Sequence, residues 1–444
     1  MKSTVCLFAK APRVGMAKTR LAPTLGLVGA AALAEAFLQD ALTSWQASEL
    51  LVAHTGTWKP ELWAALARHR CTPQGPGDLG QRMQRVLQLA LKSCDAAIAV
   101  GTDIPGLGED DAASALRALH DHDAVLGPAR DGGFYLLALK QCPDGLLEGL
   151  PWSSSETLDA TRERLTSQGM SVALLPERFD VDAGADLRDL HGHLQCNPGA
   201  MLNTRRFLAS DANQSVSVVM PVLNEAARLG DALCELRKIP GLSQVVVADG
   251  GSCDESVAIA ARHSGVDVVQ CAPGRAGQMN AGAKRAFGGT LLFLHADARL
   301  PSDACAQIRQ TLAIPGACGG AFRLQTDYDV LGRHRPWVAP FLRLADMRSR
   351  YTSLPYGDQA PFVRAATFHA LGGFRDLPLF EDLEFAQRLG QRGRWGKTKG
   401  AVRVSGRRFQ ERPFYYLGLM NTFPLLYRLG VSPQRLAAFY HQTR

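Results

Sequence analysis

The chain has 444 residues, 46% of them hydrophobic and 20% charged, which are ordinary globular values that exclude a disordered chain, a collagen-like rod and a disulfide scaffold. At about 100–200 residues per domain, this length predicts two or three domains. The net charge of +7 divides into −3 for residues 1–210 and +10 for the remainder, so the basic half could meet nucleic acid, an anionic membrane surface or phosphorylated substrates.

Cysteine spacing and apolar run lengths indicate the compartment. Ten cysteines are scattered without a CxxC spacing, and reduced thiols in a cytoplasm are the simplest interpretation. We find no apolar run near the ~20 residues that a membrane-spanning helix needs. The opening apolar segment, Val5 to Ala9, is shorter than the ~7–15-residue core of a secretory signal. We therefore expect a cytoplasmic protein that begins with a β-strand.

Strand-like and helical segments alternate along the chain. AALAEAFLQDAL has a helical period and DAAIAVGTD is strand-like; later, the helical segment SVAIAARHSG lies between the strands QVVVADGGS and TLLFLHAD. The small polar run at 209–215 is typical of a linker. The alternation predicts α/β domains with doubly wound parallel sheets and ligands at the carboxyl ends of the strands. We expect domains at 1–209 and 216–444, joined by a linker at 210–215.

The two halves begin alike. STVCLFAKAP and SVSVVMPVLNE are both short β-branched strands that end in proline. In IAVGTDIPGL and LLFLHADARLP an aspartate, Asp103 or Asp297, follows a buried strand. We therefore expect two variants of one fold, with both carboxylates facing the crevice at the strand ends.

Cationic residues gather in one loop of the first half. FAKAPRVGMAKTRLAPTLG is a strand, then a loop with Gly15, Lys18 and Arg20, then a helix. A glycine-permitted turn with cations at a helix start suits a diphosphate or triphosphate. The alternative is a solvated basic loop.

Acidic and amide side chains mark the second half. Asp249 ends a strand before a Gly250-Gly251 turn, and Asp297 lies where a metal bound to a diphosphate would be held. Mg²⁺ or Mn²⁺ favours carboxylate and phosphate oxygens. Alternatively, Asp249 is an ordinary turn residue, and an acidic pair at a helix start simply complements the helix dipole. The further candidates are Glu225, Arg275, Gln278, Asn280, Glu381 and Asp382.

Through QMNAGA, LHADARLP, GDQ and ED, residues 215–440 resemble the family 2 glycosyltransferases, which have the GT-A fold, and most closely the radical-SAM/selenodomain-associated transferase 2 group. The resemblance implies that Glu225 and Asp249 contact the nucleoside and that Asp297 contacts the metal and diphosphate. The ED motif, Glu381-Asp382, would be catalytic, with Asp382 matching the base of inverting members. Arg275, Gln278 and Asn280 would bind the nucleotide-sugar. The usual DxD pair is here His295-Ala296-Asp297, so His295 is the second candidate metal ligand.

The first half resembles the DUF2064 family, or selenodomain-associated transferase 1, over almost all of 1–205. It is more distantly similar to GT-A-fold nucleotidyltransferases such as molybdopterin and phospholactate guanylyltransferases. The shared parts are the AKTRL loop, the aspartate after the central strand and a late DVD aspartate. The similarity implies that Lys18 and Arg20 bind phosphates, that Asp103 and Asp182 hold a metal, and that Asp131 lies near the substrate.

Two further segments have plain interpretations. FYYLGLMNTFPLLYRLGVSP (414–433) reads as a helix that covers the sheet, with Pro424 as a kink, in preference to a segment that contacts a membrane. QRGRW (391–395) matches a processive-synthase pattern, but we expect it to continue the helix of Asp382, so we treat the match as coincidence.

The whole chain therefore predicts a bifunctional transferase of two tandem GT-A-type, Rossmann-like domains. The second half would transfer a sugar from a nucleotide-sugar to an acceptor, with inversion and with Mg²⁺ or Mn²⁺. The first half would be a nucleotide-dependent nucleotidyl- or glycosyltransferase. The main alternative is a nucleotidyltransferase whose second half only binds a nucleotide-sugar. Nucleic acid is not an expected partner, because zinc spacing and RNP-like aromatics are missing. The oligomeric state is open.

Overall fold

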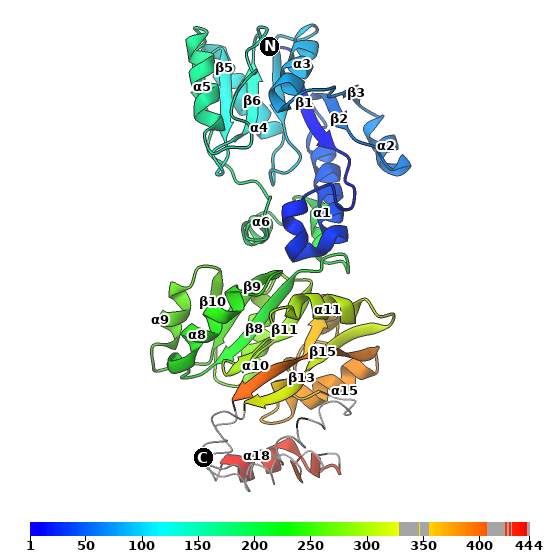
Figure 1. Ribbon diagram of the computed structural model, residues 1–444, viewed down its shortest axis with the longest axis vertical. Helices are drawn as coiled ribbons and strands as arrows, with labels where there is room; N and C mark the ends of the chain where they lie inside the picture. The colour runs from blue at the N-terminus through cyan, green and yellow to red at the C-terminus, as the bar shows by residue number, and fades with distance from the viewer. Residues whose placement is uncertain (328–345, 347–354, 406–421, 424–425, 428, 442–444) are drawn as a thin grey trace. The chain divides into compact units, whose positions relative to one another are not determined.

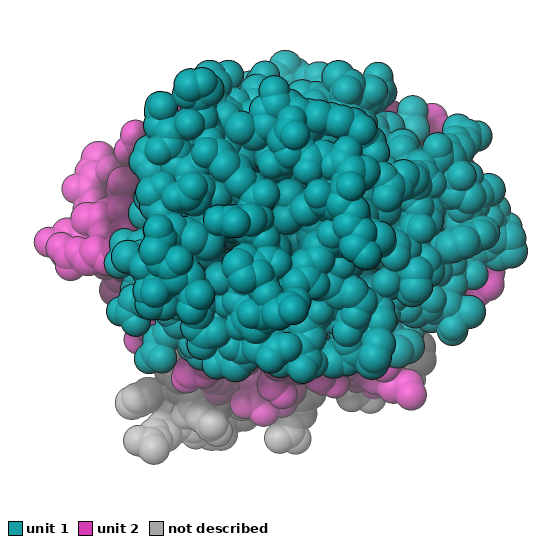
Figure 2. Space-filling model, turned by 90° about the horizontal axis from the view of Figure 1, so that it is seen from above, with its two compact units in different colours: residues 1–208 teal, residues 209–444 magenta. Residues whose placement is uncertain are grey.

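The protein is described by a computed structural model over residues 1–327, 346, 355–405, 422–423, 426–427 and 429–441. It divides into two compact units, Met1–Leu208 and Ala209–Arg444, which Figure 2 distinguishes by colour. Each unit has its own sheet and its own hydrophobic core. Residues 414–421, 424–425 and 428 of the predicted tail segment at 414–433, Pro424 among them, lie outside the described residues.

The first unit has a seven-stranded sheet of order β3-β2-β1-β4-β6-β5-β7. Strand β6 runs antiparallel to both of its neighbours, and the other pairs are parallel. The strands are β1 Ser3–Lys10, β2 Glu49–Thr55, β3 Arg70–Pro73, β4 Ala96–Val100, β5 Ala124–Pro128, β6 Phe134–Leu139 and β7 Val172–Leu174.

The second unit has an eight-stranded sheet of order β10-β9-β8-β11-β14-β13-β15-β12. Its strands are β8 Val216–Val222, β9 Leu242–Asp249, β10 Val266–Gln270, β11 Thr290–Phe293, β12 Ala298–Arg299, β13 Ala317–Asp327, β14 Phe362–Arg364 and β15 Arg394–Ser405.

The two sheets share one strand order. When the strands of each unit are numbered in chain order and β12 is left out, the two sheets have the same order of strands. In this order β14 takes the place of β6, and each is antiparallel to both of its neighbours. The fifth strand of each unit in this numbering pairs with the last, β5 with β7 and β13 with β15, and the pairing is parallel in both units. The prediction that both halves are α/β variants of one fold is therefore confirmed.

Helices cover both faces of each sheet because alternate strand residues pack into different cores (Figure 1). On β1, Val5 and Leu7 belong to one apolar cluster and Cys6 to another. On β8, Val218 and Val219 divide in the same way. The first unit has α1 Ala22–Ser44, α2 Pro60–Leu66, α3 Leu79–Leu91, α4 Glu109–Asp121, α5 Thr157–Ser167, α6 Asp186–Cys196 and α7 Leu202–Leu208. The second has α8 Ala226–Arg237, α9 Ser256–Arg262, α10 Arg275–Arg285, α11 Ala304–Leu312, α14 Ala365–Ala370, α15 Glu381–Gly390 and α18 Pro433–His441.

One apolar segment is longer than the sequence analysis allowed. The helical stretch Thr19–Ser44, which includes the short turn η1 (Thr19–Leu21), is long and apolar enough by composition to span a membrane. More than half of its most apolar window is buried inside the protein. Leu25, Leu33 and Phe37 are among the largest fully buried or nearly buried side chains of the first unit. Burial inside the first unit accounts for this apolar character, since core helices pass the same compositional test.

The QRGRW segment was misread. Helix α15 ends at Gly390, and the chain turns before Arg394 and Trp395 open strand β15. Two glycines, at 390 and 393, flank this turn, which explains why the helical period does not continue. The segment therefore does not lie on the helix of Asp382.

The linker region also has more structure than its small, polar composition suggests. Asn213 and Ser215 are buried in the second unit. The Ser215 hydroxyl donates to the Asn213 side chain and accepts from the backbone N–H of Gly289. All ten cysteines are free, as their spacing predicts.

Two glycines of α10 test how tightly this helix packs on the sheet. A Cβ at Gly282 would lie 2.4 Å from Val219 Cγ1, whereas one at Gly277 meets nothing within 4 Å. We expect Gly282→Ala to lower the free energy of unfolding by about 1–3 kcal/mol through overpacking. Gly277→Ala should raise it by ~0.5–1 kcal/mol, because glycine is the poorer helix former. Chemical denaturation of both variants measures this, and equal shifts would show that α10 is not tightly seated.

Candidate functional site

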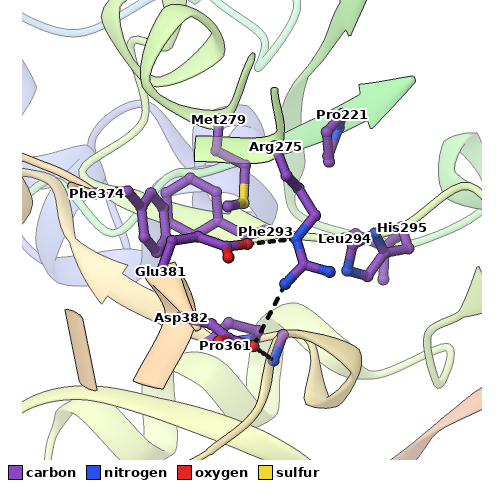
Figure 3. A pocket seen from close by; sticks show the side chains of 11 residues that line it. Pro221, Arg275, Met279, Phe293, Leu294, His295, Pro361, Phe374, Glu381 and Asp382 are labelled. Atoms are coloured by element: carbon purple, nitrogen blue, oxygen red, sulfur yellow. Dashed lines mark hydrogen bonds and ion pairs between the residues drawn. The ribbon is translucent and has the colours of Figure 1, made fainter. Parts of the chain in front are cut away.

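A small pocket opens in the second unit between the ends of β8 and β11, the first turns of α10 and the start of α15 (Figure 3). Aromatic and thioether side chains form one side of the pocket, and Arg275 points from α10 toward two carboxylates on α15. Its lining consists of Pro221, Arg275, Met279, Phe293, Leu294, His295, Gly357, Pro361, Phe374, Glu381 and Asp382. Four predicted site residues, Arg275, His295, Glu381 and Asp382, therefore meet here.

Arg275 pairs with both members of the ED motif. Its Nε donates a short hydrogen bond to Glu381 Oε1, and its Nη2 lies 3.6 Å from Asp382 Oδ2. The Glu381 side chain is 2% exposed, and that of Arg275 is 45% exposed. Burial raises the pKa of Glu381, which Arg275 opposes and Asp382 reinforces. Burial opposes the charge of Arg275, but Glu381 and Asp382 outweigh it and hold its pKa above the ordinary value.

The Asp382 carboxylate is held by two backbone groups. The N–H of Gly357 donates to Oδ2 at 2.6 Å, and the N–H of Leu383 donates to Oδ1 at 2.8 Å. Its side chain is only 11% exposed. The residue before α15, Phe380, has a left-handed backbone with φ 65°, a conformation that costs energy outside glycine and sets the direction in which the helix starts.

Gly357 is a site residue that the sequence analysis did not assign. It opens the short turn η3 (Gly357–Gln359), and a Cβ there would lie 3.0 Å from Asp382 Oδ2, 3.5 Å from His295 Nε2 and 3.6 Å from Arg275 Nη2. Three polar groups thus converge on Gly357, where an added Cβ would press on the Asp382 carboxylate. The GDQ motif was the available signal, but its spacing does not reveal which backbone group faces Asp382.

Several predicted nucleotide-sugar ligands have their polar atoms engaged inside the fold. Asp249 accepts the N–H groups of Gly251 and Ser252, each at 3.0 Å, as the turn interpretation expected. Gln278 donates to the carbonyls of Val222 and Ala248 and so joins the ends of β8 and β9.

Asn280 and Glu225 are likewise held by local contacts. Asn280 exchanges two hydrogen bonds with the backbone of Phe374, at 2.8 and 2.9 Å. Glu225 forms an ion pair with Arg228 at 3.2 Å, and its N–H donates to Ser256 Oγ. Asp249, Gln278, Asn280 and Glu225 do not line the pocket of Arg275.

The candidate metal ligands of this unit follow β11. His295 lines the pocket, and Asp297 is partly exposed two residues later. Within the described ranges, no group of three or more histidine, cysteine or acidic side chains gathers closely enough to hold an ion alone. Imidazole and carboxylate fit Mn²⁺, and Mg²⁺ also binds through few protein ligands with substrate phosphates and water. The donor set therefore fits an ion shared with a diphosphate.

A larger cavity of about 350 Å³ opens in the first unit at the carboxyl ends of β1 and β4. Its walls are mostly apolar and aromatic, with Phe8, Phe134 and Tyr135 among them. The charged groups in its lining are Lys10, Lys18 and Asp103. Its volume falls in the range of small-molecule sites, and apolar walls with few charges are typical of them.

Lys18 lies between the two predicted metal ligands of this unit. Its Nζ is 2.8 Å from Asp103 Oδ2 and 2.6 Å from Asp182 Oδ1. Burial opposes the ammonium charge, but the two carboxylates outweigh it and raise the pKa of Lys18. Burial also works against the Asp103 charge, yet Lys18 holds the pKa of Asp103 below its ordinary value. Arg20 is largely exposed, 3.6 Å from Asp182.

A further carboxylate, Asp180, was missed. Burial is the largest cause that raises the pKa of Asp180, and the negative charges of Asp131, Asp182 and Asp103 raise it further. All four acids therefore share one electrostatic neighbourhood. The DVD segment contains both Asp180 and Asp182, but the family resemblance pointed only to the second. Asp131 itself is exposed and accepts the N–H of Gly133 at 2.9 Å.

Two protein families match successive parts of the chain. Residues 38–154 match an uncharacterized bacterial family, DUF2064, and residues 217–368 match glycosyl transferase family 2. A segment of 163 residues is 30% identical to an uncharacterized glycosyltransferase of Mycobacterium tuberculosis, covering 36% of this chain and 71% of that protein. A segment of 194 residues is 28% identical to 2-phospho-L-lactate guanylyltransferase of Methanothermobacter thermautotrophicus, covering 42% and 85%.

Solved structures resemble parts of the chain as well. A nucleotide-diphospho-sugar transferase of Desulfovibrio desulfuricans is 29% identical, with a TM-score of 0.41, over 47% of this chain and 99% of that one. A mannosyltransferase of Pyrobaculum calidifontis, solved with GDP-Man and Mn²⁺, is 20% identical, with a TM-score of 0.34, over 43% and 56%. Because both TM-scores are below 0.5, the assignment of the fold depends on the strand order and on the family match instead. The chain belongs to glycosyl transferase family 2 through its second unit, which follows a DUF2064 unit, and it is a glycosyltransferase.

Proposed function

We propose that the second unit transfers a sugar from a nucleotide-sugar to an acceptor hydroxyl, with inversion and with Asp382 as the general base. The position of Asp382 is the observation that supports this most directly. Its carboxylate lines the pocket, and the Gly357 N–H fixes one oxygen at 2.6 Å. A general base has to be aimed at the proton that it accepts, and two backbone donors restrain Asp382 in one orientation.

Arg275 and Glu381 hold this base in place. Glu381 is buried and bonded to Arg275, so its role is to anchor the guanidinium rather than to accept a proton from the acceptor. Arg275 remains partly exposed, so it can contact the diphosphate of the donor while Nε stays on Glu381. Charge on the leaving diphosphate would then be balanced beside the base.

The reaction is proposed to use a divalent cation. Mg²⁺ or Mn²⁺, when bound, supplies charge neutralisation for the departing diphosphate. Asp297 and His295 are the side chains of this unit that would hold it, since His295 lies in the same pocket as Asp382.

The first unit is proposed to act on a nucleotide as well. Its cavity combines apolar walls, which suit a base and sugar, with two lysines and a cluster of carboxylates, which suit phosphates and a cation. The likeness to a guanylyltransferase supports nucleotidyl transfer, with Lys18 and Arg20 on phosphates and Asp103 and Asp182 on the cation. A glycosyl transfer at this site is the second possibility, because both units share one strand order.

Together these proposals make the chain a bifunctional transferase for small nucleotide substrates. The rival function keeps nucleotidyl transfer as the only chemistry and leaves the second unit as a nucleotide-sugar binding module. The proposed location is the cytoplasm, where ten free cysteines stay reduced.

Asp382→Asn tests the base. We expect nucleoside diphosphate release from the sugar-nucleotide to fall by about 10²- to 10⁴-fold, the usual contribution of a general base. The amide keeps the shape of the side chain, so donor affinity should stay close to wild type. Asp376→Asn, which removes an exposed carboxylate ahead of α15, is the matched control and should keep full activity. Unchanged turnover in Asp382→Asn would remove it from the role of base.

Two products separate the two units. Nucleotidyl transfer from a nucleoside triphosphate to a sugar phosphate releases pyrophosphate, whereas sugar transfer releases a nucleoside diphosphate. We expect Asp103→Asn to lower only pyrophosphate release and Asp382→Asn to lower only nucleoside diphosphate release, because each residue lies in a different unit. Pyrophosphate release alone in the wild type would establish the binding-module alternative. Loss of both products in either single variant would contradict two independent sites.

A further inference from the structure

The ammonium of Lys18 occupies the position between two carboxylates that a cation would neutralise. Its Nζ is 2.8 Å from Asp103 and 2.6 Å from Asp182, and both contacts are hydrogen-bonded ion pairs. Asp103 follows β4, and Asp182 precedes α6, so the lysine joins two distant parts of the chain. Charge-assisted bonds of this length are among the strongest polar contacts in proteins.

The lysine is built into this position rather than resting on a surface. Its side chain is only 13% exposed, and its backbone has a left-handed conformation with φ 47°. Such a conformation in a residue other than glycine persists only where neighbouring contacts stabilise it. Lys10 also lines the cavity and provides a contrast, because the contacts that join the two carboxylates come from Lys18.

A divalent ion and this ammonium cannot occupy the same position. The ion would need the oxygens that Lys18 now contacts, and two cations at such distances repel strongly in a partly buried site. Removing the ammonium without another anion to receive it would leave a buried charge unpaired, which is costly. The phosphates of a substrate would be such an anion, since Lys18 lines the cavity itself.

We propose that Lys18 is the resident counter-cation of the first unit. Its ammonium holds Asp103 and Asp182 together and excludes a free divalent ion, and it leaves them only when phosphate oxygens receive it. The ion and the phosphates therefore bind cooperatively, each favouring the other. The release by phosphate rests on the proposed nucleotide-dependent reaction of this unit, whereas the exclusion of free ion does not.

Binding of Mn²⁺ alone to the full-length chain tests the exclusion. Free Mn²⁺ is measured by electron paramagnetic resonance during titration of the wild type, Lys18→Met and Lys10→Met, so ions bound elsewhere cancel in the comparison. We expect Lys18→Met to bind one Mn²⁺ at Asp103 and Asp182 with an affinity at least about tenfold higher than the wild type has at these carboxylates. A factor of this size is within the usual range of coupling between two sites. Lys10→Met should bind as the wild type does.

The double variant Lys18→Met with Asp103→Asn locates the gained ion. Loss of the additional site there supports the proposal, and its persistence overturns it, because the ion would then lie elsewhere. Equal Mn²⁺ binding in the wild type and Lys18→Met also overturns it.

Thermal unfolding gives a readout that does not depend on affinity. Without metal, Lys18→Met should have a lower Tm than the wild type, and Mn²⁺ should restore it. In this variant Asp103 loses the cation that it contacts, and Asp182 keeps only the largely exposed Arg20 at 3.6 Å. A variant that stays unfolded even with Mn²⁺ contradicts the idea that an ion can replace the ammonium. No nucleotide is present in these measurements. If the first unit released no pyrophosphate, its proposed reaction would be refuted, but the result on Mn²⁺ exclusion by Lys18 would still hold.

Discussion

Carboxylates gathered in a partly buried site require a cation, and both units meet this requirement from their own sequence. Mutual repulsion and partial burial make a group of acids unstable unless opposite charge lies within a few ångströms. In the first unit Lys18 joins Asp103 and Asp182. In the second, Arg275 joins Glu381 and Asp382.

In both units one cationic side chain contacts two carboxylates, but the two cations come from different positions along the chain. Lys18 comes from the loop after the first strand, and Arg275 opens the helix after the third strand of its unit. Two sheets of one strand order therefore reach the same electrostatic arrangement with different segments. The shared sheet supplies only an edge where several chain segments meet. The side chains on those segments decide which chemistry each unit can perform.

The type of a residue predicted where it lies in the fold better than it predicted what its side chain contacts. The strand-end rule placed Asp103 at the first site, because parallel strands expose their carboxyl ends on one edge, and the DxD position of the resembled family pointed to His295 at the second. Gln278 and Asn280 lie on α10, and their amides bond to the backbone of β8, β9 and Phe374. The residue type is the same for an amide that binds a substrate and for one that joins the ends of two strands. The contact that distinguishes them lies up to 94 residues away along the chain.

The sequence by itself determined the α/β class, the repetition of one fold, the position of Asp103 after a strand and that of Glu381 and Asp382 at the start of a helix. These features depend on local periodicity and on the order of strands and helices, which are written along the chain. Only the tertiary structure decided the partners of those acids. Lys18 lies 164 residues from Asp182, and Arg275 lies 106 residues from Glu381. Gly357 reaches Asp382 through a backbone N–H that every residue except proline possesses. Such contacts leave no local pattern, because they arise only where the folded sheet brings distant loops together.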